Sequence, residues 1–116
     1  MKVNFDIELL PEAVDFLEQL EEKAREKIYY NLRKSQFVNE LFKKLNDFIW
    51  EFRTLHNNKA YRLFAFWDKT AAQKILVITT HGILKKTQKT PTKEIKKAEE
   101  IRRLYLEYKL QKNQQT

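Results

Sequence analysis

Positive charges gather around HGILKKTQKTP, residues 81–91, which follows a run of apolar residues. The candidate functional side chains of this segment are His81, Lys85, Lys86 and Lys89. Between residues 81 and 116, ten lysines and arginines face only four acidic residues, whereas residues 1–80 are almost neutral with 13 against 12. Such a concentration of charge is typical of a protein with a polyanionic partner, but a solvated lysine-rich face would show the same composition.

Arg62 is the second feature that points to an anion. It stands among aromatic residues in YRLFAFW, where a buried guanidinium is costly unless it has an anionic partner or opens on a ligand. A salt bridge to Glu51, or a side chain that reaches out to water, would explain it equally well. Strand alternation predicts Phe64 and Phe66 on the face of Arg62 and Tyr61 on the opposite face.

These side chains suit RNA chemistry. RNA can be cleaved without a metal when the 2′-hydroxyl attacks the adjacent phosphorus, provided that cations stabilise the phosphoryl oxygens and a group transfers protons. Arginine engages two phosphate oxygens and keeps its charge, clustered lysines lower one another's pKa, and His81 titrates near neutrality. Tyr61 is a candidate for stacking on bases. His81 is explained as well by a hydrogen-bonded histidine at a strand end, so the pattern supports an RNA-binding domain and not yet a nuclease.

Other chemistries find little support. A single glycine excludes a glycine-rich phosphate loop, and the only serine, Ser35, stands at an expected helix break and not in a readable catalytic triad. Two histidines without acidic residues at ligand spacing predict no metal site, and we expect no cofactor. The absence of cysteine, of a signal-like segment and of a long apolar run predicts a soluble cytoplasmic protein without a membrane partner.

The remaining sequence predicts the elements that must position these residues. With 116 residues we expect a single domain over residues 1–116, with 111–116 as a frayed tail. Strands are predicted at 3–8, 47–55, 60–68 and 73–81, and helices from Pro11 to about Ser35, from Val38 to Leu45 with Lys43 and Lys44 exposed, and from Thr90 onward. The order strand, helix, helix, three-stranded meander, helix predicts an α+β domain. We expect its helices on one sheet face and the basic segment as a loop at the edge of the other, partly open face.

Three segments resemble a known superfamily. LFKKLNDFIWEFR, YRLFAFW and HGILKKTQKTPTKEIKKAEE together are similar to the RelE/ParE toxins, and among them to the phage-related HigB-like branch, over almost the whole chain. The resemblance implies a RelE-like fold, a curved antiparallel sheet flanked by helices. It also implies the toxin of a type II toxin–antitoxin pair. Such toxins are typically ribosome-dependent mRNA endoribonucleases, and a helix-turn-helix antitoxin of the HigA type neutralises them and carries the complex to operator DNA.

The resemblance also assigns roles to residues. Arg62 matches the strand arginine that contacts the scissile phosphate, and Lys85 or Lys86 matches a second phosphate-binding cation after the last strand. Further candidates for RNA contact are Arg53, Lys89, Lys43, Lys44 and Tyr61, and His81 is a candidate for proton transfer. ParE-like members inhibit DNA gyrase, so gyrase inhibition and non-catalytic RNA binding stay open as alternatives.

Overall fold

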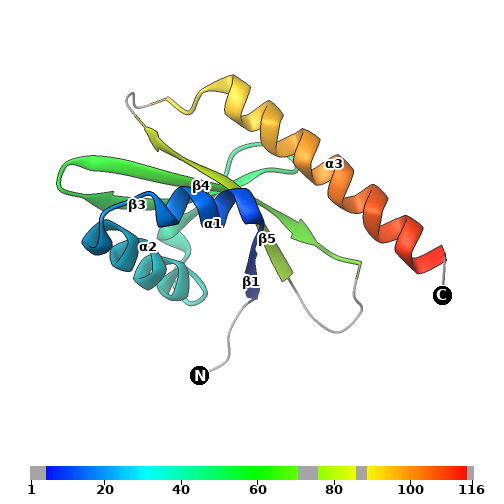
Figure 1. Cartoon of the computed structure of the whole chain (residues 1–116), viewed down its shortest axis with the longest axis horizontal. Coiled ribbons are helices and arrows are strands. Elements are labelled where there is room, and N and C mark those ends of the chain that lie inside the picture. The colour runs from blue at the N-terminus through cyan, green and yellow to red at the C-terminus, as the bar shows by residue number, and fades with distance from the viewer. Residues whose placement is uncertain (1–4, 71–75, 86–88, 115–116) are drawn as a thin grey trace.

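The structure, a computed structural model, describes residues 5–70, 76–85 and 89–114 of the chain. Its elements are β1 (Asp6–Leu9), α1 (Pro11–Glu18), α2 (Glu22–Ser35), a 3-10 turn η1 (Asn39–Leu41), β2 (Phe42–Lys44), β3 (Trp50–His56), β4 (Lys59–Asp68), β5 (Leu76–Lys85) and α3 (Thr92–Gln114) (Figure 1). This is an α+β architecture, as the sequence predicts, and it is compatible with a RelE-like fold.

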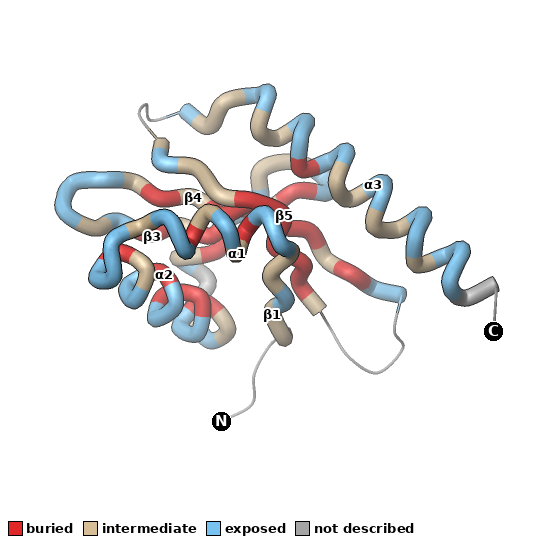
Figure 2. The backbone as a smooth tube through the Cα atoms, viewed as in Figure 1, coloured by how far each residue is buried: buried red, intermediate tan, exposed pale blue. Residues whose placement is uncertain are grey.

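The five strands form one sheet in the order β1-β5-β4-β3-β2. Neighbouring strands from β2 to β5 are antiparallel, but β1 lies parallel to β5 at the edge, so the sheet is mixed and not antiparallel as expected. The apolar sequence of β5 fits its place in the sheet, since α1 contacts it on one face and α3 on the other. Burial is concentrated along β4 and β5 in the middle of the sheet (Figure 2).

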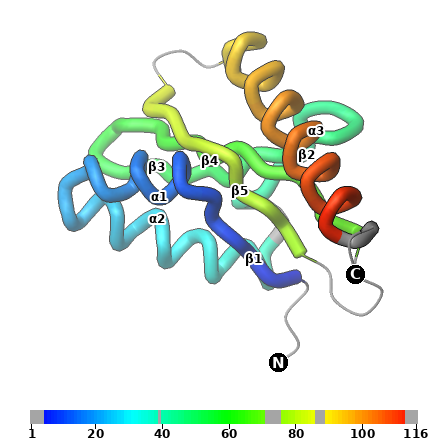
Figure 3. Tube along the Cα trace, turned by 45° about the vertical axis from the view of Figure 1, so that its right-hand side comes forward, coloured from blue at the N-terminus to red at the C-terminus, as the bar shows by residue number. Residues whose placement is uncertain are grey.

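Helices cover both faces of the sheet, whereas the sequence led us to expect them on one face only. Helices α1 and α2 lie on one side and α3 lies on the other (Figure 3). The buried residues of the α1–α2 side are Phe5, Leu17, Ala24, Ile28, Leu32, Phe42, Phe52, Tyr61, Leu63, Ala65 and Val77. Those of the α3 side are Ile49, Phe64, Phe66, Ile78 and Ala98. The predicted alternation along β4 is therefore confirmed, and α3 covers part of the face that was expected to be open.

The first predicted helix is in fact two helices. α1 ends at Glu18 and a tight turn follows, in which the Leu20 amide donates to the Leu17 carbonyl over 3.2 Å. The apolar spacing continues across the break, so periodicity alone did not reveal it. α1 packs on β5 and β1 whereas α2 packs on β3, and the turn lets the two segments bury apolar residues against different strands.

The segment predicted as a second amphipathic helix is the turn η1 followed by the edge strand β2. Phe42 decides its conformation, because its ring stacks on Phe52 at 4.3 Å and on Trp50 at 4.8 Å between centroids. These cross-strand aromatic contacts outweigh a helical pattern that spans only two turns. Lys43 and Lys44 consequently point to opposite faces of the sheet instead of sharing one helix face.

The basic segment is also more regular than expected. Its first part, His81 to Lys85, continues strand β5 and is not a loop. α3 begins at Thr92, slightly later than predicted, and it runs to Gln114 through most of the segment expected to fray. Among the described residues, no helix is long and apolar enough to cross a membrane.

Candidate functional site

Four charged residues gather on the α3 face of the sheet, and we call them the basic cluster: Glu51, Arg53, Arg62 and Lys85. Arg53 on β3 and Arg62 on β4 are register partners, so their side chains share one face. Lys85 on β5 pairs with Ala60, which shares the face of Arg62 because the two are separated by one residue on β4. Three adjacent strands therefore bring together cations that are up to 32 positions apart in the sequence.

Glu51 lies at the centre of the basic cluster. Its side chain is completely buried, and its two oxygens are shared among three partners. Oε2 accepts a hydrogen bond from Arg53 Nε at 2.9 Å, and Oε1 accepts one from the Thr90 hydroxyl at 3.0 Å. Arg62 Nε lies 3.4 Å from Oε1, close enough for an ion pair but outside hydrogen-bond geometry. The carboxylate thus links β3, β4 and the segment that leads into α3.

The sequence allowed two interpretations of Arg62, a salt bridge to Glu51 or a ligand site. The structure contains the ion pair with Glu51. This ion pair does not account for the whole cluster, because one carboxylate faces three cations and two positive charges are left over. Burial lowers the pKa of Arg62, and the neighbouring Arg53 lowers it further, while Glu51 opposes both effects. Arginine keeps its charge at neutral pH in spite of this shift, so the excess positive charge persists.

The surroundings of Lys85 lower its pKa from the ordinary value of a lysine. Burial lowers its pKa most, the positive charges of Arg62 and Arg53 add to the shift, and Glu51 opposes it. Arg53 opens the cluster to solvent, with 41% of its side chain exposed, whereas Arg62 is exposed to only 14%. The arrangement can therefore hold an anion at the surface with Arg62 beneath it and Arg53 beside it.

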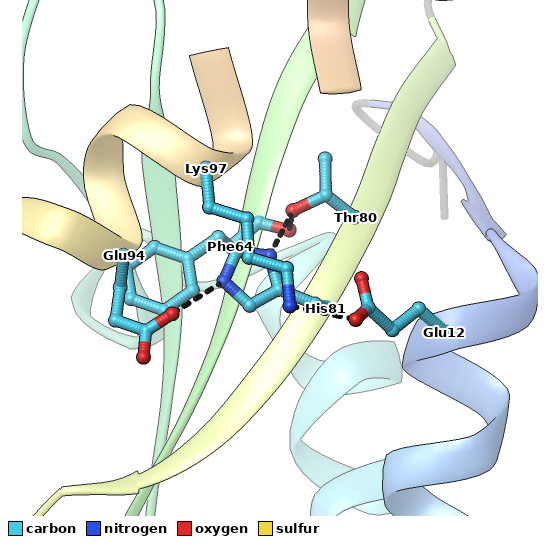
Figure 4. A network of polar contacts seen from close by, with 6 residues as sticks. All are labelled: Glu12, Phe64, Thr80, His81, Glu94 and Lys97. Atoms are coloured by element: carbon cyan, nitrogen blue, oxygen red, sulfur yellow. Dashed lines mark hydrogen bonds and ion pairs between the residues drawn. The ribbon is translucent and has the colours of Figure 1, made fainter. Parts of the chain in front are cut away.

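His81 lies on the same face in a separate network (Figure 4). Its Nδ1 is 2.9 Å from the Thr80 hydroxyl, its Nε2 is 3.2 Å from Glu94 Oε1 on α3, and its ring stacks on Phe64 with centroids 4.8 Å apart. Burial lowers the pKa of His81, the charge of Lys97 adds to the shift, and Glu94 opposes it. A neutral ring is the consequence at neutral pH, and because the Glu94 carboxylate only accepts, Nε2 carries the ring proton. Nδ1 is then an acceptor beside the Thr80 hydroxyl, and the Phe64 carbonyl, 3.3 Å from that hydroxyl, is a second acceptor for the same proton.

The position of His81 does not match a residue that contacts a substrate. Only 3% of its side chain is exposed, and both ring nitrogens already have partners. The histidine ties α3 to β5 instead. Lys97 on α3 pairs with Glu12 on α1 at 2.6 Å and so joins α3 to a helix from the other side of the sheet.

The predicted role of Tyr61 in base stacking is corrected by the structure. It is only 5% exposed and packs in the core of the α1–α2 side, on the opposite face of the sheet from the basic cluster. A base cannot stack on it there. Its aromatic character reflects core packing, which is the common role of such residues in a central strand.

The four remaining lysine candidates differ in position. Lys43 pairs with Glu51 in register and is exposed on the α3 face, whereas Lys44 pairs with Trp50 on the other face. Lys89 is exposed between β5 and α3. Lys86 lies outside the described residues. Of these candidates, Lys43 shares the sheet face of the basic cluster.

Two participants in the site were not predicted as such. The sequence indicates Glu51 only as a salt-bridge partner of Arg62, and Thr90 only as the start of the last helix. The Thr90 hydroxyl donates to Glu51, while the backbone carbonyl of Pro91 accepts the first bonds of α3 from Glu94 and Ile95. An acidic residue between two aromatic residues of a strand, one strand away from an arginine, is the sequence signal for such a centre. The described residues contain no group of three or more His, Cys, Asp or Glu that could hold a metal ion.

A comparison of the chain with models of protein families identifies the family to which the chain belongs. The model of the phage-derived Gp49-like proteins (DUF891) matches residues 15–103, which is most of the chain. The chain belongs to this family. It is a RelE-like, toxin-like family, and the matched region contains the whole basic cluster, His81 and Glu94. No curated protein matches the chain.

Proposed function

We propose that this Gp49-like protein is the toxin of a type II toxin–antitoxin pair, of the HigB-like branch, and that it cleaves mRNA on the ribosome. The observation that carries the proposal is the surplus of cations around Glu51. Three cations and one carboxylate on a sheet face give a site that favours an anion, and Arg53 offers access from solvent. The two non-bridging oxygens of a phosphodiester, which share one negative charge, fit the planar fork of an arginine.

The proposed reaction needs no metal. The 2′-oxygen of one nucleotide attacks the adjacent phosphorus, the bond from phosphorus to the 5′-oxygen of the next nucleotide breaks, and the products carry a 2′,3′-cyclic phosphate and a 5′-hydroxyl. Arg62 stabilises the charge that develops on the phosphoryl oxygens, and Arg53 holds the neighbouring backbone. Lys85, with its lowered pKa, takes the proton from the 2′-hydroxyl or supplies one to the departing 5′-oxygen, and solvent water makes the other proton transfer.

The proposal includes the partners of such a toxin. They are mRNA, the ribosome and a helix-turn-helix antitoxin of the HigA type, with operator DNA bound only through the toxin–antitoxin complex, all in the cytoplasm. Lys43, Lys44 and Lys89 are exposed and are proposed to contact the RNA backbone outside the scissile phosphate. Each such contact would be lost with rising salt concentration, because it releases a counterion.

Inhibition of DNA gyrase is the main alternative. A gyrase inhibitor would not require a phosphate site, so the excess of cations over carboxylate favours the nuclease. A third possibility is a protein that binds RNA at the basic cluster without cleaving it.

The test is tightly controlled expression in a bacterial host, followed by primer extension on abundant mRNAs. We compare the wild type with Arg62→Ala and, as a matched control, with Arg103→Ala, since Arg103 lies on α3 and pairs only with Glu100 and Glu107 in the described structure. We expect growth arrest and new 5′ ends inside coding regions for the wild type and for Arg103→Ala, and neither for Arg62→Ala, which must keep a cooperative thermal transition.

Each other outcome has a defined meaning. Growth arrest with intact mRNA would favour gyrase, and a supercoiling assay with purified protein would then decide. Unchanged arrest by Arg62→Ala would contradict the role of Arg62. No arrest by the wild type would leave RNA binding without cleavage.

A further inference from the structure

Glu51 is surrounded by the proposed catalytic cations but does not itself contact solvent. Its side chain has no exposed surface, so it cannot reach a substrate. A buried carboxylate is expensive unless its charge is compensated, and here the compensation comes from residues on other strands and from Thr90. We infer that Glu51 is a positioning residue of the RNA site, which orients Arg62 and Arg53 for the phosphate. This inference rests on the proposed nuclease function.

The orientation of Arg62 follows from its two contacts. Its Nε lies 3.4 Å from Glu51 Oε1, and its Nη1 donates to the carbonyl of Tyr61 at 3.1 Å. These contacts use one edge of the guanidinium and one of its terminal nitrogens, so the rest of the fork is available to an anion. A guanidinium held by one hydrogen bond and one ion pair loses less freedom when it binds a phosphate than one that moves in solvent.

Thr90 makes the position of Glu51 depend on α3. Its hydroxyl donates to Oε1, the same oxygen that lies near Arg62, and Thr90 stands directly before Pro91 and the start of α3. Arg53 occupies the other oxygen. Each oxygen therefore has its own hydrogen-bond donor, which keeps the carboxylate from rotating. The direction of the ion pair to Arg62 is fixed as a result.

Glu51 affects binding and cleavage in opposite directions, and this distinguishes positioning from a purely structural role. Its negative charge weakens the attraction of the cluster for phosphate, because it removes one of three positive charges. Its contacts hold Arg62 where the transition state needs it. Loss of the charge is therefore expected to strengthen RNA binding while it slows cleavage.

The experiment uses two purified variants with different defects. Glu51→Gln removes the charge and keeps the size, whereas Glu51→Asp keeps the charge and shortens the reach to Arg62 and Arg53. Binding of a labelled single-stranded RNA is measured over a range of salt concentrations, and single-turnover cleavage is measured on ribosomes programmed with mRNA. Thr90→Val is the matched control, since it removes one donor to Glu51 without changing any charge, and thermal melting of every variant gives the folded fraction.

We expect Glu51→Gln to bind RNA more tightly than the wild type, with a salt slope steeper by about 0.7 for one additional effective charge. Its cleavage rate should fall about ten- to hundredfold, as for other displacements of reacting groups. Glu51→Asp should keep the salt slope of the wild type and still cleave slowly. Thr90→Val should also keep the slope and lose less of the rate.

Cleavage by Glu51→Gln at or above the wild-type rate would overturn the inference, because Glu51 would then only reduce the charge. Binding and cleavage that fall together with the folded fraction would overturn it too, because the residue would then be purely structural. The wild type serves as the test of the proposed function in the same assay. If it does not cleave on programmed ribosomes, the nuclease proposal fails and the inference fails with it. If it does cleave, only the variants decide about Glu51.

Discussion

Gly82, the single glycine of the chain, allows α1 to approach strand β5, and Gly82→Ala tests this directly. A Cβ at residue 82 would lie 2.6 Å from Leu63 Cδ2 and 2.6 Å from Phe16 Cε2, and it would come closer still to Phe16 Cδ2. Contacts between carbon atoms are favourable only from about 3.5 Å, so the added methyl must displace the ring, the leucine or the strand. The backbone of Gly82 has no positive φ, and packing rather than conformational freedom therefore requires glycine here.

The size of the effect follows from overpacking, which costs about 1–3 kcal/mol in a well-packed core. Phe16 is only half-buried and can shift, whereas Leu63 is buried, so we expect a loss of about 2 kcal/mol in the free energy of unfolding. For a chain of 116 residues, the unfolding entropy is about 0.24 kcal/mol per kelvin, and the melting temperature should fall by about 8 °C.

Thermal and denaturant unfolding followed by circular dichroism measure this loss. The matched control is Leu84→Ala on the same strand, whose side chain is 40% exposed and should change stability much less. Phe16→Leu should reduce the cost of Gly82→Ala in a double-mutant cycle, since it removes the ring that the methyl meets. A melting temperature of Gly82→Ala within about 2 °C of the wild type would refute the steric reasoning, because 2 °C corresponds to only about 0.5 kcal/mol here.

Three further predictions concern protonation, charge and a turn. The folded chain lowers the pKa of His81, so the unfolded chain binds a proton at this residue more readily. The contribution of His81 to stability is therefore full above a pH of about 6.5 and falls as the pH drops toward the lowered folded pKa. Denaturant unfolding at several pH values should show this dependence, and His81→Gln should lack it. Lys85→Ala should weaken binding of single-stranded RNA and flatten the salt dependence of binding by about 0.7 in slope, whereas the distant control Lys112→Ala should leave the slope unchanged. An unchanged slope for Lys85→Ala would make Lys85 a solvated surface residue. Asn58 has a φ of 61°, in the left-handed region. Asn58→Ala should therefore lower the free energy of unfolding by about 1 kcal/mol, whereas Asn58→Gly should not. Equal stability of the two variants would speak against a left-handed turn.

Patterns that arise from neighbouring residues in the sequence predicted the central part of the structure well. The alternation in β4 identified the shared face of Arg62 and Phe64, because side chains of any strand alternate regardless of its neighbours. Pro11 marked the start of α1, since its missing amide hydrogen is tolerated there. The helix break near Ser35 was also predicted, and α2 ends at this residue.

Predictions failed where contacts distant in the sequence decide the structure. The aromatic contacts of Phe42 with two residues of β3 turned a helical pattern into strand β2, and these contacts form only in the sheet. The break between α1 and α2 depends on which strands the two helices pack on. Tyr61 is of a residue type that can stack on RNA bases, yet its burial against α1 and α2 makes it part of the core.

The sequence by itself determined that the chain carries an arginine in an aromatic strand, a cation-rich last third and the segments of a RelE-like family, since these depend only on residue types and their spacing. Tertiary structure alone decided which cations meet. Lys85 joins Arg53 and Arg62 because β3, β4 and β5 are adjacent. Glu51 is shared by Arg53, Arg62 and Thr90 because the segment before α3 returns to the same sheet face. Electrostatic interactions depend on distance in space and on burial, and both are set only when the sheet and α3 have packed.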